Sequence, residues 1–314
     1  MRRSLTAGVF VSTLALVAPV ATATSAGAAV TAASAQVAFT VVSGTGEGSD
    51  VFVQRRDGSG TKRLTSGGIS SDAAWSPDGA TLAYNRGSDI WLMTAAGQNI
   101  RRVMGNASGA SWSGNGAKLA FARNGRISTV ALAGGTATLL TVPSAACRDS
   151  APQWSPTSDL ILFVRSCAGE PKRVKTVSAT TRATKLVTRD GAKGAKDVVM
   201  SPAWMPDGRS ITFTANCVAV GKCTNVRNVM VADLNDSRRA VTSETDNCDP
   251  RQEDCFVGYF DVAAGSTGTG TDFAVSWNTP SGAAAPCIST LNSNMIYCEF
   301  MAWEVKQPSF QPIG

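Results

Sequence analysis

Ala74-Trp75-Ser76-Pro77-Asp78-Gly79 is a hexapeptide whose pattern returns further along the chain. The later copies are Ser111-Trp112-Ser113-Gly114-Asn115-Gly116, Gln153-Trp154-Ser155-Pro156-Thr157-Ser158 and Ala203-Trp204-Met205-Pro206-Asp207-Gly208. The tryptophans are spaced by 37, 42 and 50 residues. A repeat of this period indicates a chain built from similar supersecondary units.

Each copy is followed by three short segments with strand character. After the first copy these are Leu82-Ala83-Tyr84, Ile90-Trp91-Leu92-Met93 and Arg101-Arg102-Val103. Four short strands per unit, joined by turns rich in Gly and Asp, are typical of a β-propeller blade. The sequence therefore predicts an all-β propeller.

The two ends of the chain share one blade in this interpretation. Val37-Ala38-Phe39, Val51-Phe52-Val53 and Lys62-Arg63-Leu64 provide its second to fourth strands, and the segment around Phe310 provides the first, with Phe in place of Trp. This pairing would close the ring and remove a free sheet edge. A weaker repeat is placed at Phe256 to Phe260, Phe273 to Trp277, near Ile288 and Met295 to Phe300. The count is then six blades, with five or seven as alternatives.

These repeats resemble the WD-like repeats of TolB-type six-bladed β-propellers, over about residues 36–243 and more faintly over 244–314. The resemblance implies the fold and is confined to the propeller, since residues 36–314 leave no room for the N-terminal α/β domain of TolB. It says little about activity, because propellers host unrelated functions.

The N-terminus has the features of a secretory signal. Met1-Arg2-Arg3 precedes an apolar run from Leu5 to Ala21, and small-residue sites follow that end at Ala28 and Ala35. We expect residues 1–28 to be the signal peptide, with cleavage as late as residue 35 as the alternative, and residues 36–314 to be the propeller. No later segment approaches the roughly 20 apolar residues of a membrane span. The expected location is secreted, periplasmic or on the exterior of the cell envelope.

The chain has 8 cysteines, all after the signal. An even number in an exported chain favours disulfides over a metal site, because no Cys-x-x-Cys spacing occurs. We expect the pairs Cys147–Cys167, Cys217–Cys223, Cys248–Cys255 and Cys287–Cys298, and a swapped pairing among Cys217, Cys223, Cys248 and Cys255 remains open. The loops with six of these cysteines would share one side of the disc, together with the longest insertions. Long loops fastened to a rigid scaffold are where binding usually resides.

The composition argues against several classes of enzyme. The chain has 0 histidines, which excludes His-based triads and His-ligated metals. The net charge of +6 is mild and not clustered, so we expect no nucleic-acid partner. No nucleophile elbow or phosphate-binding loop is present. We therefore expect a protein that is not an enzyme.

The residues that stand out are assigned as follows. We expect Trp75, Trp112, Trp154, Trp204 and Phe310 to be structural core residues at equivalent repeat positions, and Asp78 and Asp207 to be turn residues. Three basic pairs fall on outermost strands, where their charge would block the addition of another sheet; the alternative is that they bind an anionic polymer. These pairs are Lys62-Arg63, Arg101-Arg102 and Arg238-Arg239. Asp72, Asp149 and Asp197 precede first strands and would stand near the mouth of the central channel, where they could hold a cation or a basic peptide.

The expected function is an exported, non-catalytic, monomeric scaffold. It would bind a protein or peptide partner of the envelope or the extracellular space through its disulfide-rich loop face. No cofactor is expected; calcium is considered, but no Asp-x-Asp-x-Asp-Gly loop is present. The alternative is a carbohydrate-binding protein, or a carboxylate-dependent lyase or glycosidase, acting at the channel mouth.

Overall fold

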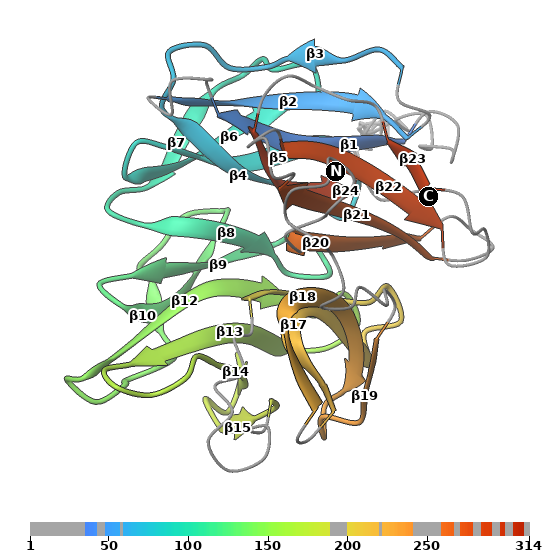
Figure 1. Ribbon diagram of the computed structural model, residues 1–314. Coiled ribbons are helices and arrows are strands. Elements are labelled where there is room, and N and C mark those ends of the chain that lie inside the picture. Colours follow the sequence, from blue (N-terminus) through green and yellow to red (C-terminus); the bar gives the residue numbers. More distant parts are fainter. Residues whose placement is uncertain are drawn as a thin grey trace, which may run out of the picture.

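The computed structural model describes residues 35–42, 48–56, 59–188, 200–219, 222–240, 259–266, 271–278, 284–290, 296–298 and 304–310. These residues contain no helix, and their strands form six four-stranded antiparallel sheets, here called blades 1 to 6. Figure 1 shows the blades following one another in chain order around the molecule. The predicted all-β propeller is confirmed.

The strands of blades 1 to 3 run in order from the centre of the ring outward. Blade 1 consists of β24 (Glu304–Phe310), β1 (Gln36–Val42), β2 (Ser49–Arg55) and β3 (Lys62–Arg63). Blade 2 consists of β4 (Ser70–Trp75), β5 (Thr81–Arg86), β6 (Asp89–Thr94) and β7 (Arg101–Met104). Blade 3 consists of β8 (Ser108–Trp112), β9 (Lys118–Arg123), β10 (Arg126–Ala131) and β11 (Thr138–Leu139).

Blades 4 to 6 repeat the same order. Blade 4 consists of β12 (Cys147–Trp154), β13 (Leu160–Cys167), β14 (Arg173–Ser178) and β15 (Thr184–Leu186). Blade 5 consists of β16 (Met200–Trp204), β17 (Ser210–Ala219), β18 (Lys222–Asp233) and β19 (Arg238–Ala240). Blade 6 consists of β20 (Tyr259–Ser266), β21 (Thr271–Asn278), β22 (Ala284–Thr290) and β23 (Ile296–Cys298).

The ring is closed by the pairing of the two chain ends. Strand β24 lies antiparallel to β1, with Phe310 opposite Val37 and Glu304 opposite Val42 (Figure 1). The first strands of neighbouring blades also contact one another in the cycle β24, β4, β8, β12, β16, β20 and back to β24. The predicted closure is therefore confirmed. One boundary is wrong: the first strand of blade 6 continues to Ser266, whereas it was expected to end at Phe260, because this repeat has no Trp-Ser-Pro turn to mark the boundary. Residues 256–258 of the expected strand lie outside the described residues.

Tryptophans of the repeat pack between neighbouring blades, as predicted. Trp75, Trp112 and Trp204 are buried, and Trp154 is half-buried against the core between blades 3 and 4. The indole N–H of Trp112 donates to the carbonyl of Ala74 at 3.0 Å. Trp204 donates in the same way to the carbonyl before Trp154, at 2.9 Å. Each of these two side chains thus fills an inter-blade gap and satisfies a first-strand carbonyl of the preceding blade. The side chain of Phe310 lies outside the described residues.

The first strands share a feature that positions the channel lining. The residue three before the tryptophan has a left-handed backbone in blades 2 to 5, with φ between 48° and 65°. These residues are Asp72, Gly109, Ala151 and Ser201. The strand register shifts at each of them, so each forms a β-bulge. Left-handed geometry is unfavourable for Ala and Ser, so the surrounding fold must impose it.

The turns that follow the tryptophans are stabilised by hydrogen bonds within each turn and by close packing between neighbouring turns. In the first copy the Ser76 hydroxyl donates to Oδ1 of Asp78 and accepts from the N–H of Thr81. Asp207 accepts from backbone N–H groups of its own turn, so both aspartates have the predicted structural contacts. In blade 3 the proline of the motif is replaced by Gly114, where a Cβ would stand 2.3 Å from the carbonyl oxygen of Pro156 in the next blade.

Among the described residues, no helix is long and apolar enough to cross a membrane.

Candidate functional site

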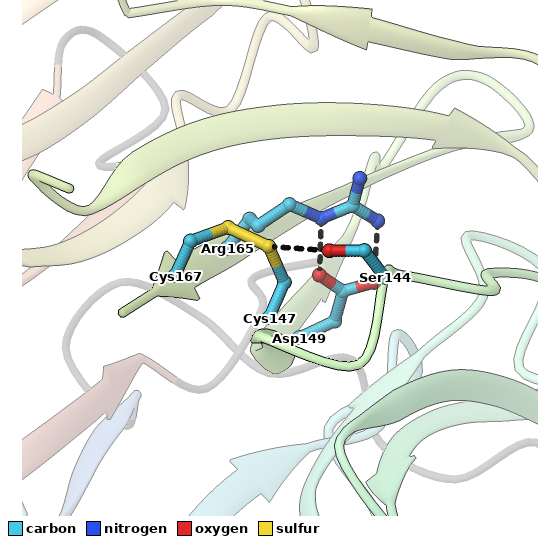
Figure 2. The surroundings of a disulfide bond; sticks show 5 residues. All are labelled: Ser144, Cys147, Asp149, Arg165 and Cys167. Atoms are coloured by element: carbon cyan, nitrogen blue, oxygen red, sulfur yellow. Dashed lines mark hydrogen bonds and ion pairs between the residues drawn. A yellow bond between two sulfur atoms is a disulfide. The ribbon is translucent and has the colours of Figure 1, made fainter. Parts of the chain in front are cut away.

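A disulfide fastens the start of blade 4. Cys147 begins β12, Cys167 ends β13, and the two residues lie directly opposite each other in the strand register. Their sulfur atoms are bonded, as predicted for this pair, and Figure 2 shows the surroundings. The hydroxyl of Ser144 donates to the sulfur of Cys147 at 3.2 Å. Both cysteines are strand residues, whereas the sequence interpretation had placed them in loops; β12 and β13 extend further than the repeat predicted.

Asp149 lies two residues from this disulfide and is held by Arg165. Nε and Nη2 of Arg165 donate to the two carboxylate oxygens of Asp149 at 2.7 and 2.8 Å (Figure 2). The side chain of Asp149 is 0% exposed and that of Arg165 is 19% exposed. Two parallel charge-assisted hydrogen bonds fix both position and orientation. The hydrogen bond to Asp149 is also the main reason that the pKa of Arg165 is raised above its ordinary value.

A second cation belongs to the same group. Lys175 is a half-buried residue of β14, opposite Phe163 in the register. Burial lowers its pKa, the positive charge of Arg165 lowers it further, and the negative charge of Asp149 opposes both. Both oxygens of the Asp149 carboxylate therefore accept from a cation of the same blade, which leaves them little capacity to bind a metal ion.

Asp72 is held by a different set of contacts. Its Oδ2 accepts from Nδ2 of Asn85 at 2.6 Å and from the Ser71 hydroxyl at 3.4 Å. Oδ1 of Asn85 in turn accepts from the N–H of Gly109 in blade 3, at 3.3 Å. Gly109 lies against Ala151, because a Cβ at Gly109 would stand 3.9 Å from Cα of Ala151. Asp72 thus belongs to a chain of contacts that joins the bulges of blades 2, 3 and 4.

The structure describes two of the three aspartates predicted at the channel mouth, and their backbone settings differ. Asp72 and Asp149 were expected to precede first strands, but both lie within them, because β4 and β12 begin earlier than the repeat predicted. Asp72 is a bulge residue three before its tryptophan, whereas Asp149 is a paired residue opposite Arg165. Asp197 lies outside the described residues. A role for these aspartates in binding a cation or a basic peptide stays a prediction.

The other predicted disulfides are placed only by their backbones. Cys217 lies opposite Cys223, and Cys287 lies opposite Cys298, in antiparallel strand pairs like that of Cys147 and Cys167. The side chains of these four residues are not among those described, and Cys248 and Cys255 lie outside the described residues altogether. These three pairs stay predictions, as does the alternative among Cys217, Cys223, Cys248 and Cys255.

Arg165 is the residue that sequence reasoning missed, although a signal existed. Arg86, Arg123 and Arg165 each stand eleven residues after the tryptophan of their repeat. Arg86 and Arg123 end the second strands of their blades, and Arg165 lies two residues before the end of β13, on the side of the disc that carries the disulfide. Arg86 lies over the ring of Trp91, and Arg165 lies over the ring of Phe163. A basic residue thus recurs at one repeat position, and among the described residues only Arg165 of the three is paired with a carboxylate.

Backbone hydrogen bonds connect the loops of the disulfide-bearing face, which we define as the connections between second and third strands and between successive blades. Gly87 donates to the carbonyl of Ile69, and Asp149 donates to that of Gly125, at 2.7 and 2.9 Å. Apolar side chains are exposed on these connections: Val142 is 71% exposed and Ile69 is 55% exposed. The face thus combines fixed loops, exposed apolar side chains and arginines.

In two of the basic pairs on outermost strands, an arginine forms an ion pair within its own blade. Arg63 forms an ion pair with Asp50, and Arg102 forms one with Asp89 at 2.9 Å. Hydrogen bonding from the backbone of Asn106 is the main reason that the pKa of Asp89 is lowered. A basic side chain that is paired with its own blade has less capacity to bind an anionic polymer. These contacts favour the edge-protecting interpretation for β3 and β7.

Comparisons with known proteins agree with this architecture. The family model described as TolB beta propeller domain matches residues 12–197. TolB from Acinetobacter baumannii has 16% identity and a TM-score of 0.69, covering 89% of this chain and 67% of that one. The putative TolB from Agrobacterium tumefaciens has 14% identity and a TM-score of 0.60, covering 84% and 87%.

An enzyme is also among the similar structures. An oligogalacturonate lyase in complex with manganese has 13% identity and a TM-score of 0.53, covering 79% of this chain and 70% of that one. No curated protein sequence matches the chain. At these identities the similar structures show the fold alone. The family model spans more than half of the sequence and includes three of the four tryptophan-centred copies, so the chain belongs to the TolB β-propeller domain family.

Proposed function

We propose that this chain is an exported, non-catalytic scaffold that binds a protein or peptide partner through its disulfide-bearing face. The observation that carries the proposal is the fastening of that face around Cys147–Cys167 and the buried Asp149–Arg165 pair. A loop surface that is already fixed loses little conformational entropy when a partner binds. The chemistry of the face suits a partner that presents apolar and acidic side chains, since Val142 and Ile69 are exposed on its connections and Arg86 and Arg123 end second strands on the same side.

Asp149 also bears on the choice between binding and catalysis. A glycosidase-type mechanism needs a pair of carboxyl groups of which one is a general acid with a raised pKa. Both carboxylate oxygens of Asp149 instead accept hydrogen bonds from Arg165. Oδ2 of Asp72 accepts hydrogen bonds from Asn85 and Ser71. These contacts support a binding role over acid–base catalysis at the first strands.

The test is partner capture with matched surface variants. Val142→Asp places a charge in the exposed apolar part of the face. The control variant, Leu186→Asp, places a charge outside the face, at a 45% exposed residue of β15 on the outer edge of the ring. The exported protein, carrying a proximity-labelling enzyme, is expected to label the same partner in wild type and Leu186→Asp and to lose it in Val142→Asp. Equal labelling by both variants would contradict the proposed face.

A polysaccharide screen tests the enzymatic alternative. Wild-type protein is incubated with acidic and neutral polysaccharides, and new reducing or unsaturated ends are measured. No product is expected. Depolymerisation that is lost in Asp72→Asn would overturn the non-catalytic proposal and establish a channel-mouth enzyme.

A further inference from the structure

A cavity of about 550 Å³ lies between blades 2 and 3, away from the disulfide-bearing face. It is lined by the turn between β4 and β5, the connection between β6 and β7, and the turn between β8 and β9. In a four-stranded antiparallel blade these connections share one side of the disc, and the strand ends with Cys147 and Cys167 lie at the other. The volume is in the range of pockets that take small ligands, about 300–1,000 Å³.

The inner wall of the cavity is apolar and its rim is polar. Leu92, Trp112 and Leu132 belong to the core between blades 2 and 3, and this core ends at the cavity. Around it stand hydrogen-bonding side chains, namely those of Ser76, Thr94, Asn99 and Asn115. An apolar wall with a few polar groups at its mouth is the usual make-up of a site for a small ligand.

The strand register explains why Arg101, and not Arg102, lines this cavity. Arg101 lies opposite Leu92, and Arg102 lies opposite Trp91. Directly opposed residues of an antiparallel pair share a face of the sheet, so Arg101 lies on the face of Leu92 and Arg102 on the other. Arg102 forms its ion pair with Asp89 there. Arg101 is exposed and has no carboxylate within ion-pair distance among the residues that the structure describes.

The cavity also carries one defined negative charge, on Asp78. Oδ1 of Asp78 accepts from the Ser76 hydroxyl and from the N–H of Ala80, and these hydrogen bonds lower the pKa of the carboxyl. Asp78 is therefore ionised at neutral pH. A carboxylate and a guanidinium on one rim disfavour a ligand with several negative charges and suit one with a single carboxylate.

We propose that this cavity binds an apolar side chain next to a free α-carboxylate, with the carboxylate paired to Arg101 and the side chain packed on Trp112 and Leu132. Two sources present this chemistry: the carboxyl terminus of a peptide, and a free apolar amino acid. In the second case the ammonium group would lie near Asp78. The site is separate from the face assigned to the protein partner, so either proposal can fail without the other.

The test uses isothermal titration calorimetry on the disulfide-intact protein with three probes: N-acetyl-L-leucine, L-leucine and N-acetyl-L-leucinamide. Saturable binding of at least one carboxylate probe is expected, together with an amide at least about tenfold weaker, because a hydrogen bond to a charged group is lost. Arg101→Gln should weaken the carboxylate probe about tenfold, whereas the control Arg102→Gln on the same strand should leave it unchanged. Tighter binding of N-acetyl-L-leucine would identify a peptide terminus, and tighter binding of L-leucine a free amino acid.

A filling variant tests the location independently of charge. Leu132→Trp places a larger side chain at the cavity wall, and its fold is checked by its thermal unfolding. It should abolish binding of both carboxylate probes. The proposal is overturned if neither carboxylate probe binds, if the amide binds equally well, if Arg101→Gln and Arg102→Gln weaken binding to the same extent, or if a folded Leu132→Trp binds like wild type.

Discussion

Replacing Arg165 and replacing Asp149 should lower the free energy of unfolding by different amounts. Arg165→Met leaves the carboxylate of Asp149, 0% exposed, without its two hydrogen bonds. Removal of one partner of a buried pair typically costs about 3–5 kcal/mol. Lys175 lies close enough to interact with both charges and should keep the loss near about 3 kcal/mol. Asp149→Asn leaves a guanidinium that is 19% exposed and an amide oxygen that can still accept, so its loss should be about 1–2 kcal/mol.

Urea denaturation at pH 7 with disulfides intact, followed by tryptophan fluorescence, measures both losses. The double variant Asp149→Leu with Arg165→Met removes both charges, and it should recover most of the loss of Arg165→Met, since an apolar pair needs no compensating charge. The reasoning is refuted if Arg165→Met costs no more than Asp149→Asn, or if the double variant is as unstable as Arg165→Met. Circular dichroism of each variant before denaturation confirms that the native fold is compared.

Three further outcomes follow from contacts of the turns and of the core. Gly114→Ala should lower the free energy of unfolding by about 1–3 kcal/mol, because its Cβ would meet the carbonyl oxygen of Pro156 at 2.3 Å; a stability within experimental error of wild type would show that the turns do not pack this closely. Trp112→Phe should cost about 1–3 kcal/mol in urea denaturation, because the carbonyl of Ala74 loses its indole donor; no change would mean that water replaces it. The lowered pKa of Asp78 contributes stability that is fully present above the unfolded-state value of about 3.9 and is lost as the pH falls through the folded value. The free energy of unfolding of wild type should therefore exceed that of Asp78→Asn at pH 6, and the difference should shrink as the pH falls below about 3.9; a difference that does not depend on pH would contradict the assignment.

Much of the architecture could be predicted because the repeat is a local signal. The Trp-Ser-Pro-Asp-Gly turn fixes the boundary between first and second strands wherever it occurs, so blades 2 to 5 were placed from the sequence. The pairing of the strands with Val37 and Phe310 was also predicted, because the N-terminal repeat lacks a first strand and the C-terminal segment around Phe310 can supply it. Blade 6 has no such turn, and its first strand was expected to end at Phe260, whereas it continues to Ser266.

The site was less predictable because its contacts depend on register across strands. Asp149 was singled out, but its partner Arg165 is 16 residues away and becomes its neighbour only through the pairing of β12 with β13. The bulge that gives Asp72 a left-handed backbone likewise has no signature in residue type, since its equivalents are Gly109, Ala151 and Ser201. Comparison of each position across the repeats would have revealed the arginines eleven residues after the tryptophans.

Strand β1 emerges from the ribosome long before its neighbour β24 has been made. Until residue 304 is available, the inner edge of blade 1, with Val37, Ala38 and Phe39, has no strand to pair with. A nascent chain with an unpaired apolar edge is prone to wrong association, and its native pairing must bridge almost the full length of the polypeptide. Folding of this molecule is therefore expected to finish only after translation is complete, and a tag or truncation that disturbs the last strand should damage the whole ring rather than one end of it.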